Sequence, residues 1–404
     1  MDVHGSGAMT RRLWTDPGGG NDSRAMHTLA TGFRHALGRV RVAALVCAAL
    51  CAAQAGAAPL DWSIEITPGG ELFPVLDLSQ TPRDPADAAG GGSGLVAVRI
   101  TGDAPRELRV RIETEGLRAP AVVDTRMERG TTALHPRLDW NRAELQSLGA
   151  PRMQTLRVTL ESPGEAAQRR DVPVRLHPLD DALYYVREGK DRVDLGWVFA
   201  AYVDPNDPVV DEILAIAGDA DQSDGADPIG SARAVWGALE SHGLRYASGD
   251  PALSRGPSIY SQRVRLLADS WARRRANCID SSVLIASVLE RIGVRSFIVL
   301  VPGHAFVGFY AGAGHDAPEF LETTLLGAAA SGHSRSAGFD AARAAGRARW
   351  NRVAGRMDRR HRPDYALIDI ETARSYGIIP LAAAGIGGSD RSPAATAPAA
   401  PSTR

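Results

Sequence analysis

Three residues of this sequence, Cys278, His304 and Glu322, have the types and the order that thiol chemistry requires. A thiol becomes a nucleophile once a base has taken its proton, and a histidine can take that proton and later donate it to a leaving amine. A carboxylate beside the histidine fixes the tautomer of the imidazole ring. The order cysteine, histidine, acid, with Glu322 coming 18 residues after His304, therefore predicts a catalytic triad.

Cys278 lies where the sequence predicts a helix with a sharp beginning, which runs to about Gly293. Asn277 is a favoured N-cap residue, and Asp280 three residues later can complete a capping box. Cys278 would then be the first helical residue, where the helix dipole favours a thiolate by about 0.3 to 2 kcal/mol. The apolar stripe that follows predicts that this helix is central in its domain.

His304 and Glu322 are predicted to lie on strands. Two β-rich segments, 296–301 and 304–310, are separated by Pro302-Gly303, which predicts a hairpin whose second strand begins at His304. A third predicted strand, 319–324, carries Glu322. The triad would therefore come from a helix beginning and two strands.

Four further groups near the triad are candidates for supporting roles. Asp280 and Asp316 are alternatives to Glu322 as the partner of the imidazole ring. The backbone N–H of Cys278 and the side chain of Gln262 are candidate donors to an oxyanion. Gln262 is alternatively a residue on the surface of a helix.

We predict neither a metal nor a cofactor. A zinc site made of Cys278, His304 and His315 lacks the paired ligand spacing of zinc proteins. The acidic segment 219–227 misses the spacing of an EF-hand loop, and we interpret it as a solvated turn.

The hydrophobic content of 44% and the charged content of 23% are in the range of globular proteins. The pattern of apolar and polar residues along the chain predicts an α+β protein of two domains. Between residues 58 and 180, short segments that alternate apolar and charged residues, as in 108–112, predict an immunoglobulin-like β-sandwich. Helices such as 208–217 and 231–242 predict a second domain over residues 181–384. The strands predicted in the first domain are 62–66, 95–100, 107–113, 156–161 and 172–177.

The two ends of the chain carry different signals. Residues 1–57 are predicted to be a signal peptide with an N-terminal extension, because the apolar run 43–57 is too short to span a bilayer and ends in Ala55-Gly56-Ala57, a small-x-small cleavage pattern. Residues 385–404 are too poor in apolar residues to pack, which predicts a disordered tail.

Removal of the signal peptide leaves Cys278 as the only cysteine, in a protein that we expect to be periplasmic or secreted, without a stable membrane span. The formal net charge of −1 argues against a nucleic-acid partner.

The residues around the triad resemble the transglutaminase-like superfamily, a papain-related group whose members have a C-x-D/E helix beginning, a Gly-His strand and a later acid. The resemblance rests on segments 277–280, 301–308 and 321–324, and it covers roughly residues 232–326. It implies a domain in which a central helix packs on an antiparallel sheet, with Cys278 as nucleophile, His304 as base and acid, and Glu322 as orienter. The chain differs from many members at Asn277, where they have glycine, and at Glu322, where they have aspartate.

This resemblance implies an exported bacterial thiol enzyme that acts on amide bonds through an acyl-enzyme. Its expected substrate is a protein or peptide of the cell envelope. Hydrolysis is slightly favoured over transfer to an amine, because exported bacterial relatives are often proteases or envelope hydrolases. The alternatives are a non-catalytic binding or assembly module on the same scaffold and, from segment 219–227 alone, a calcium-dependent envelope protease.

Overall fold

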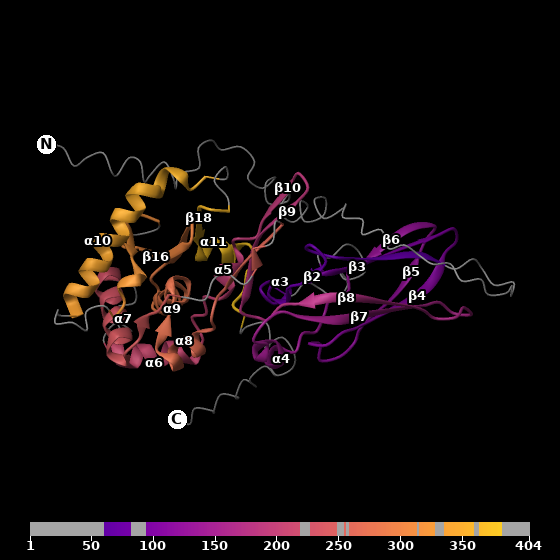
Figure 1. Cartoon of the computed structure of the whole chain (residues 1–404), viewed down its shortest axis with the longest axis horizontal. Helices are drawn as coiled ribbons and strands as arrows, with labels where there is room; N and C mark the ends of the chain where they lie inside the picture. The colour runs from indigo at the N-terminus through magenta and orange to yellow at the C-terminus, as the bar shows by residue number, and fades with distance from the viewer. Residues whose placement is uncertain are drawn as a thin grey trace, which may run out of the picture.

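The computed structural model is a mixed α+β protein (Figure 1). A β-rich N-terminal part leads into a C-terminal part in which helices surround an antiparallel sheet. The predicted signal peptide, the predicted tail and residues 219–226 of the acidic segment lie outside the described residues. The described residues are 60–81, 94–218, 227–248, 254–255, 258–312, 315–327, 335–358 and 363–381.

The N-terminal part consists of two sheets whose inner faces contribute to one core. In β4 (Arg106–Glu113), Leu108, Val110 and Ile112 are buried and the residues between them are more exposed, as the alternation predicted. The five-stranded sheet has the order β2 (Glu71–Leu72), β8 (Gln168–Leu176), β7 (Arg152–Glu161), β4 and β5 (Ala121–Met127). The three-stranded sheet has the order β1 (Asp61–Ile66), β3 (Val96–Gly102) and β6 (Gly130–Leu134). The five predicted strands are confirmed as β1, β3, β4, β7 and β8, whereas β2, β5 and β6 were not predicted. Two short helices, α3 (Pro74–Leu78) and α4 (Arg142–Ser147), accompany them.

The C-terminal part is built around a four-stranded antiparallel sheet with the order β17 (Pro318–Leu321), β16 (His304–Tyr310), β15 (Ser296–Val301) and β18 (Ala366–Asp369). The predicted hairpin is confirmed: Val301 pairs with His304, and Gly303 adopts a φ of 70° in the turn between them. Helix α9 (Cys278–Arg291) packs against β15 and β16, and its side chains are buried along most of its length.

Further helices surround this sheet. Helices α6 (Pro208–Ala217) and α7 (Pro228–His242) confirm the two helices predicted for this region. The others are α5 (Val198–Ala201), α8 (Leu267–Arg273), α10 (Arg335–Val353) and α11 (Ile370–Ser375). Within the described residues, no helix is both long enough and apolar enough to cross a membrane.

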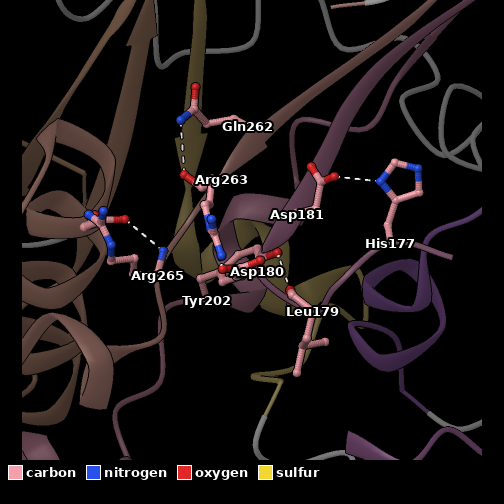
Figure 2. A network of polar contacts seen from close by, with 9 residues as sticks. His177, Leu179, Asp180, Asp181, Tyr202, Gln262, Arg263 and Arg265 are labelled. Carbon is pink, nitrogen blue, oxygen red and sulfur yellow. Dashed lines mark hydrogen bonds and ion pairs between the residues drawn. The ribbon is translucent and has the colours of Figure 1, made fainter. Parts of the chain in front are cut away.

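A second, smaller sheet, with the order β10 (Asp191–Asp194), β9 (Asp181–Glu188), β13 (Ile259–Arg263) and β12 (Ser254–Arg255), follows the N-terminal part in the chain. Next to β9, His177 is fully buried and lies against the carboxylate of Asp181 (Figure 2). Its Nδ1 lies 2.6 Å from Asp181 Oδ2, its Nε2 lies 2.6 Å from Glu71 Oε2, and its ring stacks on Phe73. Burial lowers the pKa of His177, but the two carboxylates outweigh burial and raise it. His177 therefore links Glu71 of β2 to Asp181 of β9 through two hydrogen bonds.

Candidate active site

The beginning of α9 is held by a complete capping box. Asn277 Oδ1 accepts a hydrogen bond of 2.9 Å from the N–H of Asp280, and Asp280 Oδ2 accepts one of 3.2 Å from the N–H of Asn277. Cys278 is the first residue of the helix, as the sequence predicted. Since the capping box uses the N–H groups of Asn277 and Asp280, those of Cys278 and Ile279 have no acceptor within the helix. The positive end of the helix dipole therefore lies at the thiol.

His304 lies between Cys278 and Glu322. Its Nε2 is 2.9 Å from Glu322 Oε1 and 3.2 Å from Glu322 Oε2, so Nε2 carries the proton and donates to the carboxylate. Nδ1 is the nitrogen that remains for Cys278, with which His304 also forms a hydrogen bond. Burial lowers the pKa of His304, but the hydrogen bond with Cys278 and the hydrogen bond and charge of Glu322 raise it to about 9. A protonated imidazole beside the sulfur is the arrangement that stabilises a thiolate.

Glu322 follows β17 and does not belong to it. The strand predicted over 319–324 ends at Leu321, and Glu322 caps a single 3-10 turn, η3 (Thr323–Leu325). Its Oε1 accepts hydrogen bonds from the hydroxyl (2.9 Å) and the N–H (3.3 Å) of Thr324. Its Oε2 accepts one of 2.5 Å from Nε of Arg349, a residue of α10. Burial raises the pKa of Glu322, but His304, Thr324 and Arg349 outweigh it and lower the pKa to about 2, so this carboxylate is ionised.

Asp280 and Asp316, the alternative partners of the imidazole, lie elsewhere. Asp280 is buried, and its carboxylate accepts hydrogen bonds of 2.8 Å from both the backbone N–H and Nη1 of Arg265. Its pKa is raised by burial, and its contacts hold the helix beginning in place. Asp316 lies in the turn before β17, where its carbonyl accepts a hydrogen bond from the N–H of Gly312. His304 therefore meets Glu322, and not either aspartate.

Gln262 does not join the triad in the described structure. It belongs to strand β13 and not to a helix, and its Nε2 donates to the carbonyl of the adjacent Arg263 at 3.0 Å. Figure 2 shows it in the polar network that also contains Asp180 and Asp181. Among the described residues, no hydrogen bond joins Gln262 to Cys278.

Tyr246 is a site residue that the sequence analysis missed. It ends β11 (Arg245–Tyr246), which pairs in parallel with β14 (Arg275–Ala276), so that Tyr246 lies opposite Ala276, two residues before Cys278. Burial raises the pKa of Tyr246, and the nearby negative charges of Cys278 and Glu322 raise it further. Its phenol is therefore a further hydrogen-bond donor in the neighbourhood of Cys278 and Glu322. The short β segment after the end of α7 was the only local signal for this position.

Arg349 was also missed, because an arginine in a helix rich in alanine and arginine predicts only a solvated surface.

The described residues contain no group of three or more His, Cys, Asp and Glu side chains that could hold a metal ion. No protein-family model matches the sequence, and no curated protein matches it.

Proposed function

We propose that this protein is an exported thiol enzyme of the transglutaminase-like superfamily that acts on amide bonds. The observation that supports this proposal most strongly is the hydrogen-bonded order Cys278, His304, Glu322, with the thiol at the beginning of a buried helix. The sheet β17-β16-β15-β18 with α9 on it corresponds to a papain-like domain in this proposal, and the two N-terminal sheets correspond to an immunoglobulin-like sandwich.

The first half of the reaction forms a thioester. Nδ1 of His304 takes the proton of the thiol, and Sγ of Cys278 attacks the carbonyl carbon of the amide. The carbonyl oxygen becomes an oxyanion that accepts hydrogen bonds from the backbone N–H of Cys278 and from the hydroxyl of Tyr246. His304 then donates its proton to the amide nitrogen, the C–N bond breaks, and the amine leaves.

The second half releases the acyl group. His304 takes a proton from water, whose oxygen attacks the thioester carbon. The C–S bond then breaks to give a carboxylic acid, and His304 returns its proton to the leaving sulfur, which regenerates the free thiol. An amine in place of water gives a new amide by the same steps. Glu322 stays ionised throughout and stabilises the imidazolium form of His304.

The test is to trap the acyl-enzyme on the full chain. The protein is mixed with peptide esters and amides that represent envelope peptides, quenched in acid, and digested, and the mass of the peptide that contains Cys278 is measured. The proposal expects this mass to rise by that of the acyl group, and expects no such rise for His304→Ala. A Cys278→Ala protein that turns over a substrate as fast as the wild type would overturn the mechanism. A thiol inert to both substrates and alkylating reagents would favour a binding module.

A further inference from the structure

Helix α10 carries none of Cys278, His304 and Glu322, yet it packs against β17 and η3, between which Glu322 lies. Its arginines meet two buried carboxylates. Arg343 and Arg347 pair with Glu319, at 3.1 Å and 2.6 Å, whereas Arg349 pairs with Glu322. Among the described residues, His304 forms its carboxylate hydrogen bonds with Glu322 and not with Glu319, so only the second pair touches the triad.

Three further contacts fix the distance between α10 and the segment that carries Glu322. The N–H of Glu322 donates to the carbonyl of Ala342 at 3.0 Å. At Gly346 the helix comes so close to β17 that a Cβ there would lie 2.7 Å from the carbonyl carbon and oxygen of Phe320. One turn later Trp350 stacks on the ring of Phe320, with a centroid distance of 4.7 Å. Arg349 is therefore presented to Glu322 by a rigidly docked helix.

The charges of the site balance only when Arg349 is included. In the reactive state the thiolate of Cys278 and the carboxylate of Glu322 are negative, and the imidazolium of His304 is positive. These three charges leave one negative charge in a site where only 4% of the Glu322 side chain and 13% of the His304 side chain are exposed. Arg349, on Oε2 of Glu322, supplies the missing positive charge. An unbalanced buried charge is costly, and the group that can lose its charge most easily is the thiolate.

We propose that Arg349 is a positioning residue, which neutralises and orients Glu322 so that the positive charge of His304 remains available to the thiolate of Cys278. This inference rests on the proposed function, and it adds a fourth member from a separate helix to the triad. Among the described residues, Arg349 pairs with Glu322 and with neither the sulfur of Cys278 nor the imidazole of His304. It therefore acts through Glu322.

The experiment measures the second-order rate of alkylation of Cys278 by iodoacetamide from pH 4 to 10 in the full chain, read by mass spectrometry of the peptide that contains Cys278. The variants are Arg349→Met, which removes the charge and keeps the length of the side chain, and Arg349→Lys, which keeps the charge. Arg347→Met is the matched control, because it removes an arginine from the same helix while Arg343 still pairs with Glu319.

We expect Arg349→Met to move the acidic limb of the alkylation-pH profile to higher pH by about one unit. At pH values below that limb the thiolate fraction of Cys278 then falls roughly tenfold. In Arg349→Lys we expect the acidic limb to lie nearer to its wild-type pH, and in Arg347→Met we expect it at the wild-type pH. In a Glu322→Gln background, Arg349→Met is expected to have no further effect, because the carboxylate through which it acts is gone.

An Arg349→Met profile that superimposes on that of the wild type would overturn the inference, and so would an equal shift in Arg347→Met. Should Arg349→Met fail to fold, Arg349→Gln, which is uncharged but still donates a hydrogen bond, must show the same shift. If the wild-type protein shows no fast alkylation at low pH that is lost in His304→Ala, the proposed function itself is overturned. The two failures are therefore distinguishable.

Discussion

The hydroxyl of Thr323 donates a hydrogen bond of 3.2 Å to the backbone carbonyl of Cys278. The residue next to Glu322 thereby holds the backbone of Cys278, the proposed nucleophile. The same carbonyl also accepts a bond of 2.6 Å from the hydroxyl of Ser282, within α9. Of these two bonds, only that of Thr323 connects the segment that contains Glu322 to α9.

Thr323→Val removes this connection and keeps the shape of the side chain. We expect a loss of about 1 kcal/mol in the free energy of unfolding, because a hydrogen bond is lost while the carbonyl keeps its bond to Ser282. We expect a larger proportional effect on kcat than on KM, because the distance between the acid and the thiol is no longer fixed. Thr81→Val is the control, since Thr81 donates a similar bond to the carbonyl of Gly377. An equal loss of kcat in both variants would contradict this account.

Glu322→Gln tests the role of the carboxylate. Loss of its charge removes a cause that raises the pKa of His304, so that pKa should fall from about 9 toward its ordinary value. We expect kcat to fall by roughly 10² to 10⁴, the range typical of acid and base groups. The pKa of His304 is measured by NMR titration and kcat by turnover. Glu319→Gln, three residues earlier, removes a carboxylate that pairs with Arg343 and Arg347, and kcat should change little in this variant.

The raised pKa of His304 predicts how stability depends on pH. The folded protein holds this proton up to about pH 9, whereas the unfolded chain releases it near pH 6.5. The stabilisation is therefore fully present below pH 6.5 and is lost as the pH rises through about 9, with a size on the order of 3 kcal/mol. Urea unfolding of the wild type and of His304→Ala at several pH values checks this. The difference between the two proteins should shrink across this window, and a difference that stays constant would contradict the assignment.

Gly346→Ala tests the docking of α10 on β17. The added Cβ would meet the backbone of Phe320, so we expect the helix to be displaced and the free energy of unfolding to fall by about 1 to 3 kcal/mol. Because Arg349 moves with the helix, alkylation of Cys278 should also slow at low pH. Gly237→Ala is the matched control, since Gly237 lies inside α7 and a Cβ there meets nothing within 4 Å. That variant should gain about 0.5 to 1 kcal/mol, and a loss of similar size in both variants would contradict the close approach at Gly346.

The parts of the site that the sequence could predict depend on local interactions. Asn277 and Asp280 satisfy each other across one helical turn, so the beginning of α9 is encoded in four consecutive residues. Pro302 and Gly303 determine the turn that brings His304 to the beginning of β16, because only a few residue types favour that backbone. Both features are predictable from a short window of sequence.

The parts that could not be predicted depend on residues far apart in the chain. Tyr246 reaches the site because β11 pairs with β14, and Arg349 reaches it because α10 docks on β17. Neither pairing leaves a local pattern in the sequence. Gln262 was a candidate oxyanion donor, but its strand β13 pairs with β9 and β12 in the sheet β10-β9-β13-β12. The strand predicted over 319–324 is too long, because Glu322 caps a 3-10 turn and the strand ends at Leu321.

The most direct test of the central claim is the pH dependence of iodoacetamide alkylation at Cys278, compared between the wild type and His304→Ala. An activated pair predicts fast alkylation at pH 6, with a midpoint well below that of a free thiol, and loss of this fast alkylation in the variant. Alkylation of the wild type with the midpoint of a free thiol, or none until denaturant is added, would contradict the claim that His304 activates Cys278.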